Sequence, residues 1–134
     1  PEESSQIYEE MLKSAEEILQ ALNIHYRRML LVTGDMSFAS AKTIDLEVWL
    51  PGQNRYYEVS SISNCTDFQA RRSKMRFKAG NDKPEFVHTL NGSGLATSRL
   101  MVALLENNQK EDGSVTLPTV LHKYLEGLKE LIPL

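Results

Sequence analysis

Two segments of alternating hydrophobicity, separated by a short turn, constrain the fold of this chain most strongly. Apolar residues occupy every second position from Thr43 to Leu50, which predicts a strand with one buried face. Pro51-Gly52-Gln53-Asn54 predicts a turn, and Tyr56 to Ile62 a second strand. Because the connection is so short, the two strands are expected to form an antiparallel hairpin.

The rest of the chain adds helices and further strands around this hairpin. An amphipathic helix of about 18–20 residues is expected near the N-terminus, with Ser4 or Ser5 as its cap. Its apolar positions are Ile7, Met11, Ala15, Ile18, Leu19 and Leu22. Strands are expected at 25–32 and 85–91, a short helical turn at 67–73, and helices at 95–107 and 118–131. This order predicts a single α+β domain over 1–134, with helices packed on an antiparallel sheet.

Composition excludes several classes of protein. The chain has 134 residues and a net charge of −3, which does not indicate a general nucleic-acid binder. One cysteine, Cys65, permits no intrachain disulfide, and the three histidines lie far apart, so no zinc motif is present. A cytoplasmic protein without a membrane segment or signal peptide is expected. Because the chain starts at Pro1 without Met, we expect a piece of a longer protein.

The junction between the 85–91 strand and the 95–107 helix is the strongest functional signal from local pattern. Gly92 and Gly94 bracket Ser93, and glycine lets the backbone turn sharply and a ligand approach closely. Arg99, one turn into an apolar helix, needs an anion or a π-face as its partner. The pattern suggests a guanidinium held over a nucleotide. The alternative is a tight turn, with Arg99 paired to a local carboxylate.

Carboxylates on the hairpin offer a possible metal site. Asp45, Glu47 and Glu58 could hold Mg²⁺, which prefers oxygen ligands and usually keeps phosphates as further ligands. The alternative is that they are solvated residues of a half-exposed sheet. Strict alternation places Glu58 and Ser60 on one face and Ser61 on the other, so Glu58 and Ser61 can act together only if the strand ends or bulges.

A basic run follows the hairpin and contains Arg71, Arg72, Lys74, Arg76 and Lys78. Such a run could hold RNA phosphates. The alternative is a solvated loop edge.

Read together, several segments resemble the C-terminal half of the catalytic domain of bacterial-type seryl-tRNA synthetases, a class II family. The resemblance covers about residues 5 to 126. Its motifs are Thr33 to Met36, Lys42 to Pro51, Glu58 to Asn64, Asp67 to Arg72 and His88 to Ala96. Their length and order make the match far more specific than a lone glycine pattern.

The resemblance implies a class II antiparallel sheet and an ATP-dependent ligase that forms seryl-adenylate and passes serine to tRNA(Ser). ATP, with Mg²⁺, would be held by Glu58, Val59, Ser60, Ser61 and Arg99. Within that set Glu58 and Ser61 would hold Mg²⁺, and Arg99 would be the catalytic residue, stacked on adenine and reaching the terminal phosphate. Ser93 and Asn91 would contact the serine substrate, and Arg71 and Arg72 the tRNA.

The resemblance also shows what is missing from this chain. The family's first motif, its dimer interface, is absent, as are the second motif with its α-phosphate arginine and the tRNA-gripping arm. We therefore expect a truncated domain, inactive alone, from a homodimeric parent, and self-association of the fragment through its cut edge. The alternative is a free-standing synthetase-like module that kept the fold and serves as a binding or interaction protein.

Overall fold

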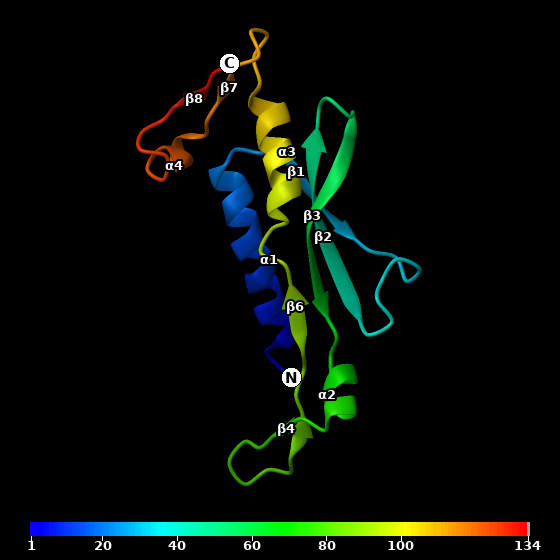
Figure 1. The fold of residues 1–134 in the computed structure, drawn as a ribbon. Coiled ribbons are helices and arrows are strands. Elements are labelled where there is room, and N and C mark those ends of the chain that lie inside the picture. Colours follow the sequence, from blue (N-terminus) through cyan, green and yellow to red (C-terminus); the bar gives the residue numbers. More distant parts are fainter. Residues whose placement is uncertain (134) are drawn as a thin grey trace.

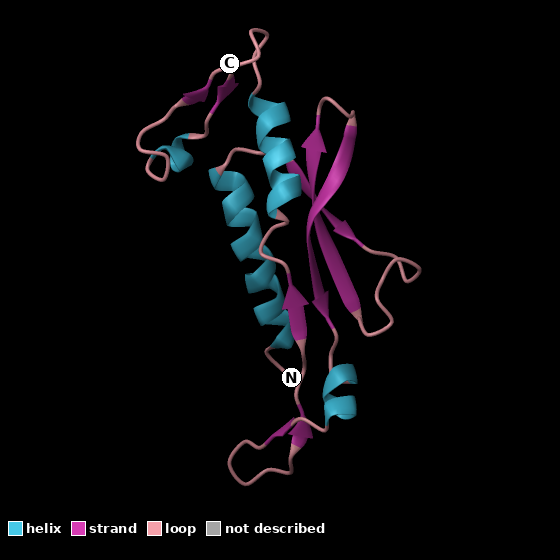
Figure 2. Ribbon diagram, in the orientation of Figure 1, coloured by secondary structure: helices cyan, strands magenta, loops and turns pink. Residues whose placement is uncertain are grey.

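The computed structural model describes residues 1–133 and contains a four-stranded antiparallel sheet in the order β1-β2-β3-β6. Helices α1 and α3 each pack on the same side of this sheet (Figures 1 and 2). The α+β architecture expected from the sequence is therefore confirmed. The elements are α1 (Ser4–Ala21), β1 (Tyr26–Leu30), β2 (Lys42–Leu50), β3 (Arg55–Asn64), α2 (Phe68–Ser73), β4 (Arg76–Phe77), β5 (Glu85–Phe86), β6 (Leu90–Gly92), α3 (Thr97–Asn108), β7 (Val115–Thr116), α4 (Thr119–His122) and β8 (Glu130–Leu131).

The β2–β3 hairpin is the centre of the core, as its alternation predicts. Leu46, Val48 and Leu50 are fully buried on the face covered by the helices. Beneath them α1 buries Tyr8, Leu12, Ala15 and Leu19, a spacing of three and four that forms one helical stripe. Burial of this apolar surface supplies the main driving force for docking the helix.

The predicted apolar face of α1 is confirmed at Ala15, Leu19 and Leu22 but was wrong at Ile7 and Ile18. Ile7 and Ile18 are 43% and 45% exposed, whereas Tyr8 and Leu12 are buried. The reason is that Tyr8 is amphipathic: its ring packs in the core, and its hydroxyl donates to the Ile62 carbonyl at 2.9 Å. Burial raises the pKa of Tyr8 to about 12.

An ion-pair network ties α1 to the edge strand β1. The Arg28 guanidinium donates to Glu16 at 2.6 Å and 2.7 Å and to Glu9 at 2.9 Å. Glu9 also lies 3.4 Å from the Lys42 ammonium. The hydrogen bonds from Arg28 lower the pKa of the Glu16 carboxyl.

A β-bulge in β3 decides which residues share a face of the sheet. Leu46 pairs with Ser60 and Glu47 with Glu58, so Val59 is an extra residue in β3. Past the bulge, Ser61 pairs with Asp45. Asp45 and Glu47 lie on the face opposite Leu46, so Glu58 and Ser61 lie there too. The bulge that the sequence required for Glu58 and Ser61 to act together is therefore present. We call this face, opposite the two helices, the polar face.

Three further local predictions were wrong. The 85–91 strand is split into β5 and β6, because the N–H groups of Val87 and Thr89 bond to Met75 and Thr66 instead. Neither serine caps α1: Glu3 is the N-cap residue without a side-chain bond, and Ser4 Oγ lies 2.8 Å from His88 Nδ1.

The third error concerns the C-terminal segment, where the 118–131 helix is reduced to the single turn of α4. The left-handed backbone of Glu126 and Gly127, with φ of 54° and 85°, prevents the helix from continuing. The chain turns back instead and pairs β8 with β7, at the far end of the molecule from the N-terminus (Figure 1). Among residues 1–133, no helix combines the length and the apolar character that a membrane crossing requires.

Candidate functional site

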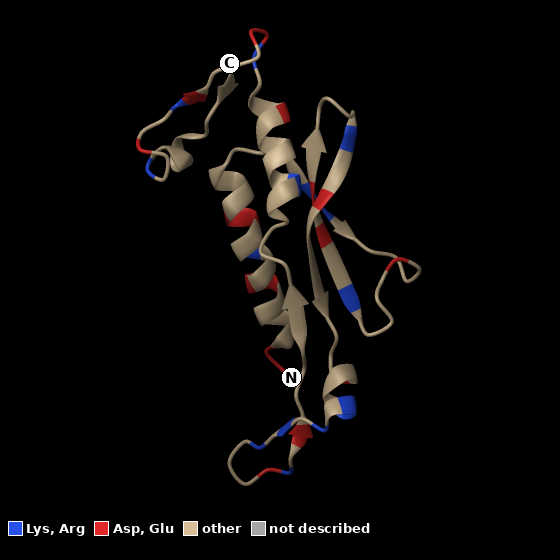
Figure 3. Cartoon of the chain, viewed as in Figure 1, with Lys and Arg blue, Asp and Glu red and all other residues tan. Residues whose placement is uncertain are grey.

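The polar face collects most of the residues that the sequence analysis singled out. Glu58 and Ser61 lie on β3, and Asn91 of β6 pairs with Ser63 on the same face. Figure 3 shows acidic bands on β2 and β3 and a basic band at the start of α3. Residues distant in sequence are thus brought to one surface by strand pairing and by the docking of α3.

Gly92 brings β6 close enough to β3 for this arrangement. A Cβ at Gly92 would lie 2.8 Å from Cγ1 of the buried Ile62, whereas Gly94 has open space around it. Beyond Gly92, the Ser61 N–H donates to Ser93 Oγ at 3.4 Å, and Ser60 Oγ donates to the Ser93 carbonyl at 2.7 Å. The Ser93 hydroxyl is therefore positioned beside Ser61.

The bulge residue anchors the start of α3. The Val59 carbonyl accepts a hydrogen bond from the Ala96 N–H at 2.6 Å, directly before the helix begins at Thr97. Val59 and Ser60 are both buried, so these inner residues of the 58–61 segment fix the 93–96 connection. The outer residues, Glu58 and Ser61, keep their polar face.

Arg99 emerges from the first turn of α3 toward Glu58. Its Nη1 donates to the Glu58 carbonyl at 3.0 Å and lies 3.6 Å from Glu58 Oε2. Its Cζ lies 5.2 Å from the centre of the Tyr57 ring. Arg99 thus has both an anion and a π-face, as expected for an arginine in an apolar helix. The side chain is still 42% exposed, and an ion pair so exposed adds little stability.

The predicted carboxylate trio does not form a metal cluster by itself. Glu47 and Glu58 lie directly opposite each other, and each has an arginine: Arg27 bonds Glu47 at 2.6 Å, and Arg99 reaches Glu58. Among residues 1–133, no group of three or more His, Cys, Asp and Glu side chains could hold a metal ion. Glu58 and Ser61 still offer a carboxylate and a hydroxyl on one face. That donor set suits Mg²⁺ bound mainly through phosphates.

The two arginines proposed for RNA lie elsewhere. Arg71 and Arg72 are on α2, beyond the end of β3 (Figure 1). Arg71 forms an ion pair with Asp67. The guanidinium carbons of Arg71 and Arg72 each lie 5.9 Å from the centre of the Phe68 ring. They do not contact Glu58, Ser61, Ser93 or Arg99.

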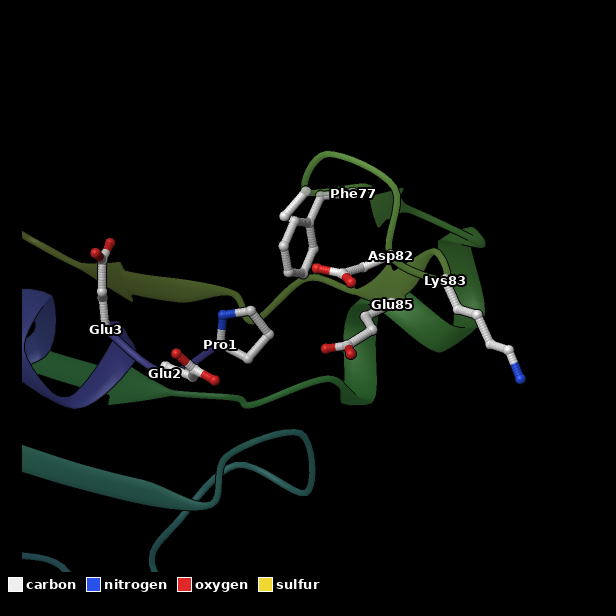
Figure 4. A pocket seen from close by; sticks show the side chains of 8 residues that line it. Pro1, Glu2, Glu3, Phe77, Asp82, Lys83 and Glu85 are labelled. Carbon is white, nitrogen blue, oxygen red and sulfur yellow. The ribbon is translucent and has the colours of Figure 1, made fainter.

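Of two hollow surfaces on the molecule, only one touches this site. One cavity of about 380 Å³ lies between the N-terminus and the β4–β5 loop, where Glu2, Asp82 and Glu85 gather near Phe77 (Figure 4). Its acidic lining is unfavourable for phosphates. A second, of about 250 Å³, lies between α1 and the Gly92–Gly94 segment, which forms part of its wall.

Two features of the site carry no signal in the sequence. In the sequence, Tyr57 is one of several aromatic residues expected in a strand. Only the packing of α3 places its ring beside Arg99. Asp45 was predicted as a solvated or metal-binding carboxylate. It is only 8% exposed, and its Oδ1 has no hydrogen-bond partner.

Known proteins resemble the chain throughout. Residues 1–108 match the family described as tRNA synthetase class II core domain (G, H, P, S and T). Serine–tRNA ligase of Chlamydia felis is 66% identical over 132 residues, and that of Chlamydia abortus 63% over 133 residues. These alignments cover 98% and 99% of this chain but 31% of each relative.

Solved structures agree with the sequence relatives. Seryl-tRNA synthetase from Pyrococcus horikoshii, complexed with ATP, superimposes with a TM-score of 0.94 and 50% identity over 100% of this chain. Cytoplasmic serine–tRNA ligase from Naegleria fowleri, in complex with AMP, gives a TM-score of 0.89 and 39% identity over 98%. The chain covers 30% and 31% of those two proteins. It therefore spans about a third of the length of the relatives it matches.

Proposed function

Because the chain belongs to the class II tRNA synthetase core domain family, we propose that it is the part of a serine–tRNA ligase that holds ATP and serine. Identity of up to 66% to serine–tRNA ligases favours serine among the amino acids that this family serves. The single observation that carries the proposal is the bulge at Val59, which puts Glu58 and Ser61 on one face beside Ser93 and Arg99.

In this proposal Arg99 holds the nucleotide. One side of its guanidinium faces Tyr57, and the exposed remainder is free to lie on adenine and to donate to the terminal phosphate. The same residue then stabilises negative charge that develops on the leaving pyrophosphate. Glu58 already accepts one hydrogen bond from Arg99 through its carbonyl, which fixes the direction of the side chain.

Glu58 and Ser61 are the residues that would hold Mg²⁺ together with the phosphates of ATP. Bound there, Mg²⁺ would neutralise phosphate charge. Ser93, held beside Ser61, and Asn91 would contact the serine substrate. The serine carboxylate then attacks the α-phosphate, giving seryl-adenylate and pyrophosphate. None of these side chains transfers a proton, so the rate comes from orientation and charge neutralisation.

The other parts of the proposal concern the whole ligase. We expect it to work in the cytoplasm as a homodimer and to aminoacylate tRNA(Ser), with Arg71 and Arg72 contributing phosphate contacts. The 134 residues alone are expected to be inactive, because the α-phosphate arginine of the family is not among them.

The test is amino-acid-dependent ATP–pyrophosphate exchange by a full-length ligase that carries this segment. We expect exchange with serine and at most a trace with glycine, alanine or threonine. Ser93→Ala should raise the KM for serine about tenfold or more, because a substrate contact is lost. Ser73→Ala, on the distant α2, is the matched control and should behave as wild type. Exchange that does not depend on serine would refute the proposal.

A further inference from the structure

Asp45 is the one carboxylate of the polar face whose charge has no partner among residues 1–133. It is 8% exposed, and its Oδ1 is buried without a hydrogen-bond donor. A buried carboxylate oxygen left unsatisfied is costly, so native proteins provide it with a donor. No described residue supplies that donor to Asp45 Oδ1.

No neighbour of Asp45 hydrogen-bonds its Oδ1 in this structure. Along β2, Thr43 Oγ1 lies 2.8 Å from Ser63 Oγ, and Glu47 is bonded by Arg27. Across the sheet, Asp45 lies between Met29 of β1 and Ser61 of β3. Met29 is apolar, and the Ser61 hydroxyl makes no hydrogen bond to Asp45 Oδ1.

The balance of charge on this face indicates what kind of donor is missing. Arg27, Glu47 and Glu58 lie side by side across strands β1, β2 and β3 and form one row. Arg27 compensates the charge of Glu47, and Arg99 compensates that of Glu58, so this row is neutral. Asp45, in the neighbouring row between Met29 and Ser61, adds one negative charge that forms no ion pair among residues 1–133. A buried charge is stable only when an opposite charge and hydrogen bonds accompany it. A cationic nitrogen satisfies both needs at once.

We propose that Asp45 binds a cationic nitrogen donor, an ammonium or guanidinium, in the assembled active site; this rests on the proposed function. Asp45 lies one strand beyond Ser61 and Ser93, on the face where serine is expected. The donor has two possible sources. One is the α-ammonium group of the substrate, and the other is an Arg or Lys from the part of the ligase outside this chain.

The experiment uses the full-length ligase with Asp45→Asn, Asp45→Glu and the exposed-loop control Asp82→Asn. Pyrophosphate exchange gives kcat and KM for serine and for ATP, and thermal unfolding gives Tm with and without serine. If the donor is the substrate ammonium, Asp45→Asn raises the KM for serine about 10–100-fold, leaves the KM for ATP unchanged, does not lower the ligand-free Tm, and abolishes stabilisation by serine. If the donor is a protein side chain, Asp45→Asn lowers the ligand-free Tm and kcat/KM for both substrates.

The Glu variant separates charge from shape. Because Asn has the shape of Asp without its charge, Asp45→Glu should retain more activity than Asp45→Asn. The proposal is overturned if Asp45→Asn matches Asp82→Asn within about twofold in every measurement, or if Asp45→Glu is the more damaged variant. A wild-type ligase without serine-dependent exchange refutes the proposed function instead, and the ligand-free Tm comparison still tests Asp45.

Discussion

Gly92 should tolerate no side chain, although its backbone conformation is accessible to any residue. A Cβ there would lie 2.8 Å from Ile62 Cγ1 and 3.3 Å from Ile62 Cβ and Cγ2. Carbon atoms prefer separations of about 3.5–4.0 Å, so the overlap is several tenths of an ångström or more. Ile62 is 1% exposed and pairs directly with Gly92, so neither residue can move away without disturbing the sheet.

Gly92→Ala should therefore reduce the free energy of unfolding by about 1–3 kcal/mol, the usual cost of overpacking. Gly94→Ala is the matched control, because nothing lies within 4 Å of a Cβ at that position. It should be neutral or stabilising by about 0.4–1 kcal/mol, since alanine restricts the unfolded chain. Urea unfolding of both variants, followed by circular dichroism, measures the difference. If Gly92→Ala is as stable as Gly94→Ala, the close approach of β6 to β3 is not a constraint.

Three further outcomes follow from the same contacts. In the full-length ligase, Arg99→Lys should slow adenylation at least about tenfold and Arg99→Ala more, with the KM for serine little changed, because only the guanidinium can stack and donate together; stopped-flow or exchange kinetics at wild-type rate for Arg99→Ala would leave it a structural ion-pair partner. Arg28 lowers the pKa of Glu16 in the folded state, so this stabilisation is present above the unfolded pKa of about 4.3 and is lost as the pH falls through the folded value; Glu16→Gln should unfold with a smaller dependence on pH between 7 and 3 than wild type. The free edge of β6 and the exposed apolar residues of α3 should make the isolated chain self-associate, and a clean monomer by light scattering at high concentration would contradict this.

The hairpin was predictable because its signal is local. Alternation from Thr43 to Leu50 follows directly from one buried face, and the turn residues between the strands are typical of a tight connection. The face of α1 was less predictable. Two apolar stripes run side by side on this helix, and only the fit of Tyr8 against Ile62 selects the inner one. The prediction of a C-terminal helix was wrong because Glu126 adopts a left-handed conformation, which a glutamate in the sequence does not indicate.

The candidate site divides in the same way. The residue types at Glu58, Ser61, Ser93 and Arg99 were visible in the sequence, but their common location depends on the bulge at Val59. A bulge arises from pairing between strands. From the sequence it could therefore be given only as a requirement for Glu58 and Ser61 to share a face, and its presence could not be predicted. The burial of Asp45 and the ring of Tyr57 beside Arg99 also depend on long-range packing.

In the proposed function, Glu58 and Arg99 act as one unit on the nucleotide. A double-mutant cycle of Glu58→Gln and Arg99→Ala in serine-dependent pyrophosphate exchange tests it most directly. Residues that share a contact and a ligand should be coupled by about 0.5–3 kcal/mol, so the double variant should be scarcely slower than the worse single variant. Strictly additive losses, or wild-type exchange in either single variant, would contradict the claim.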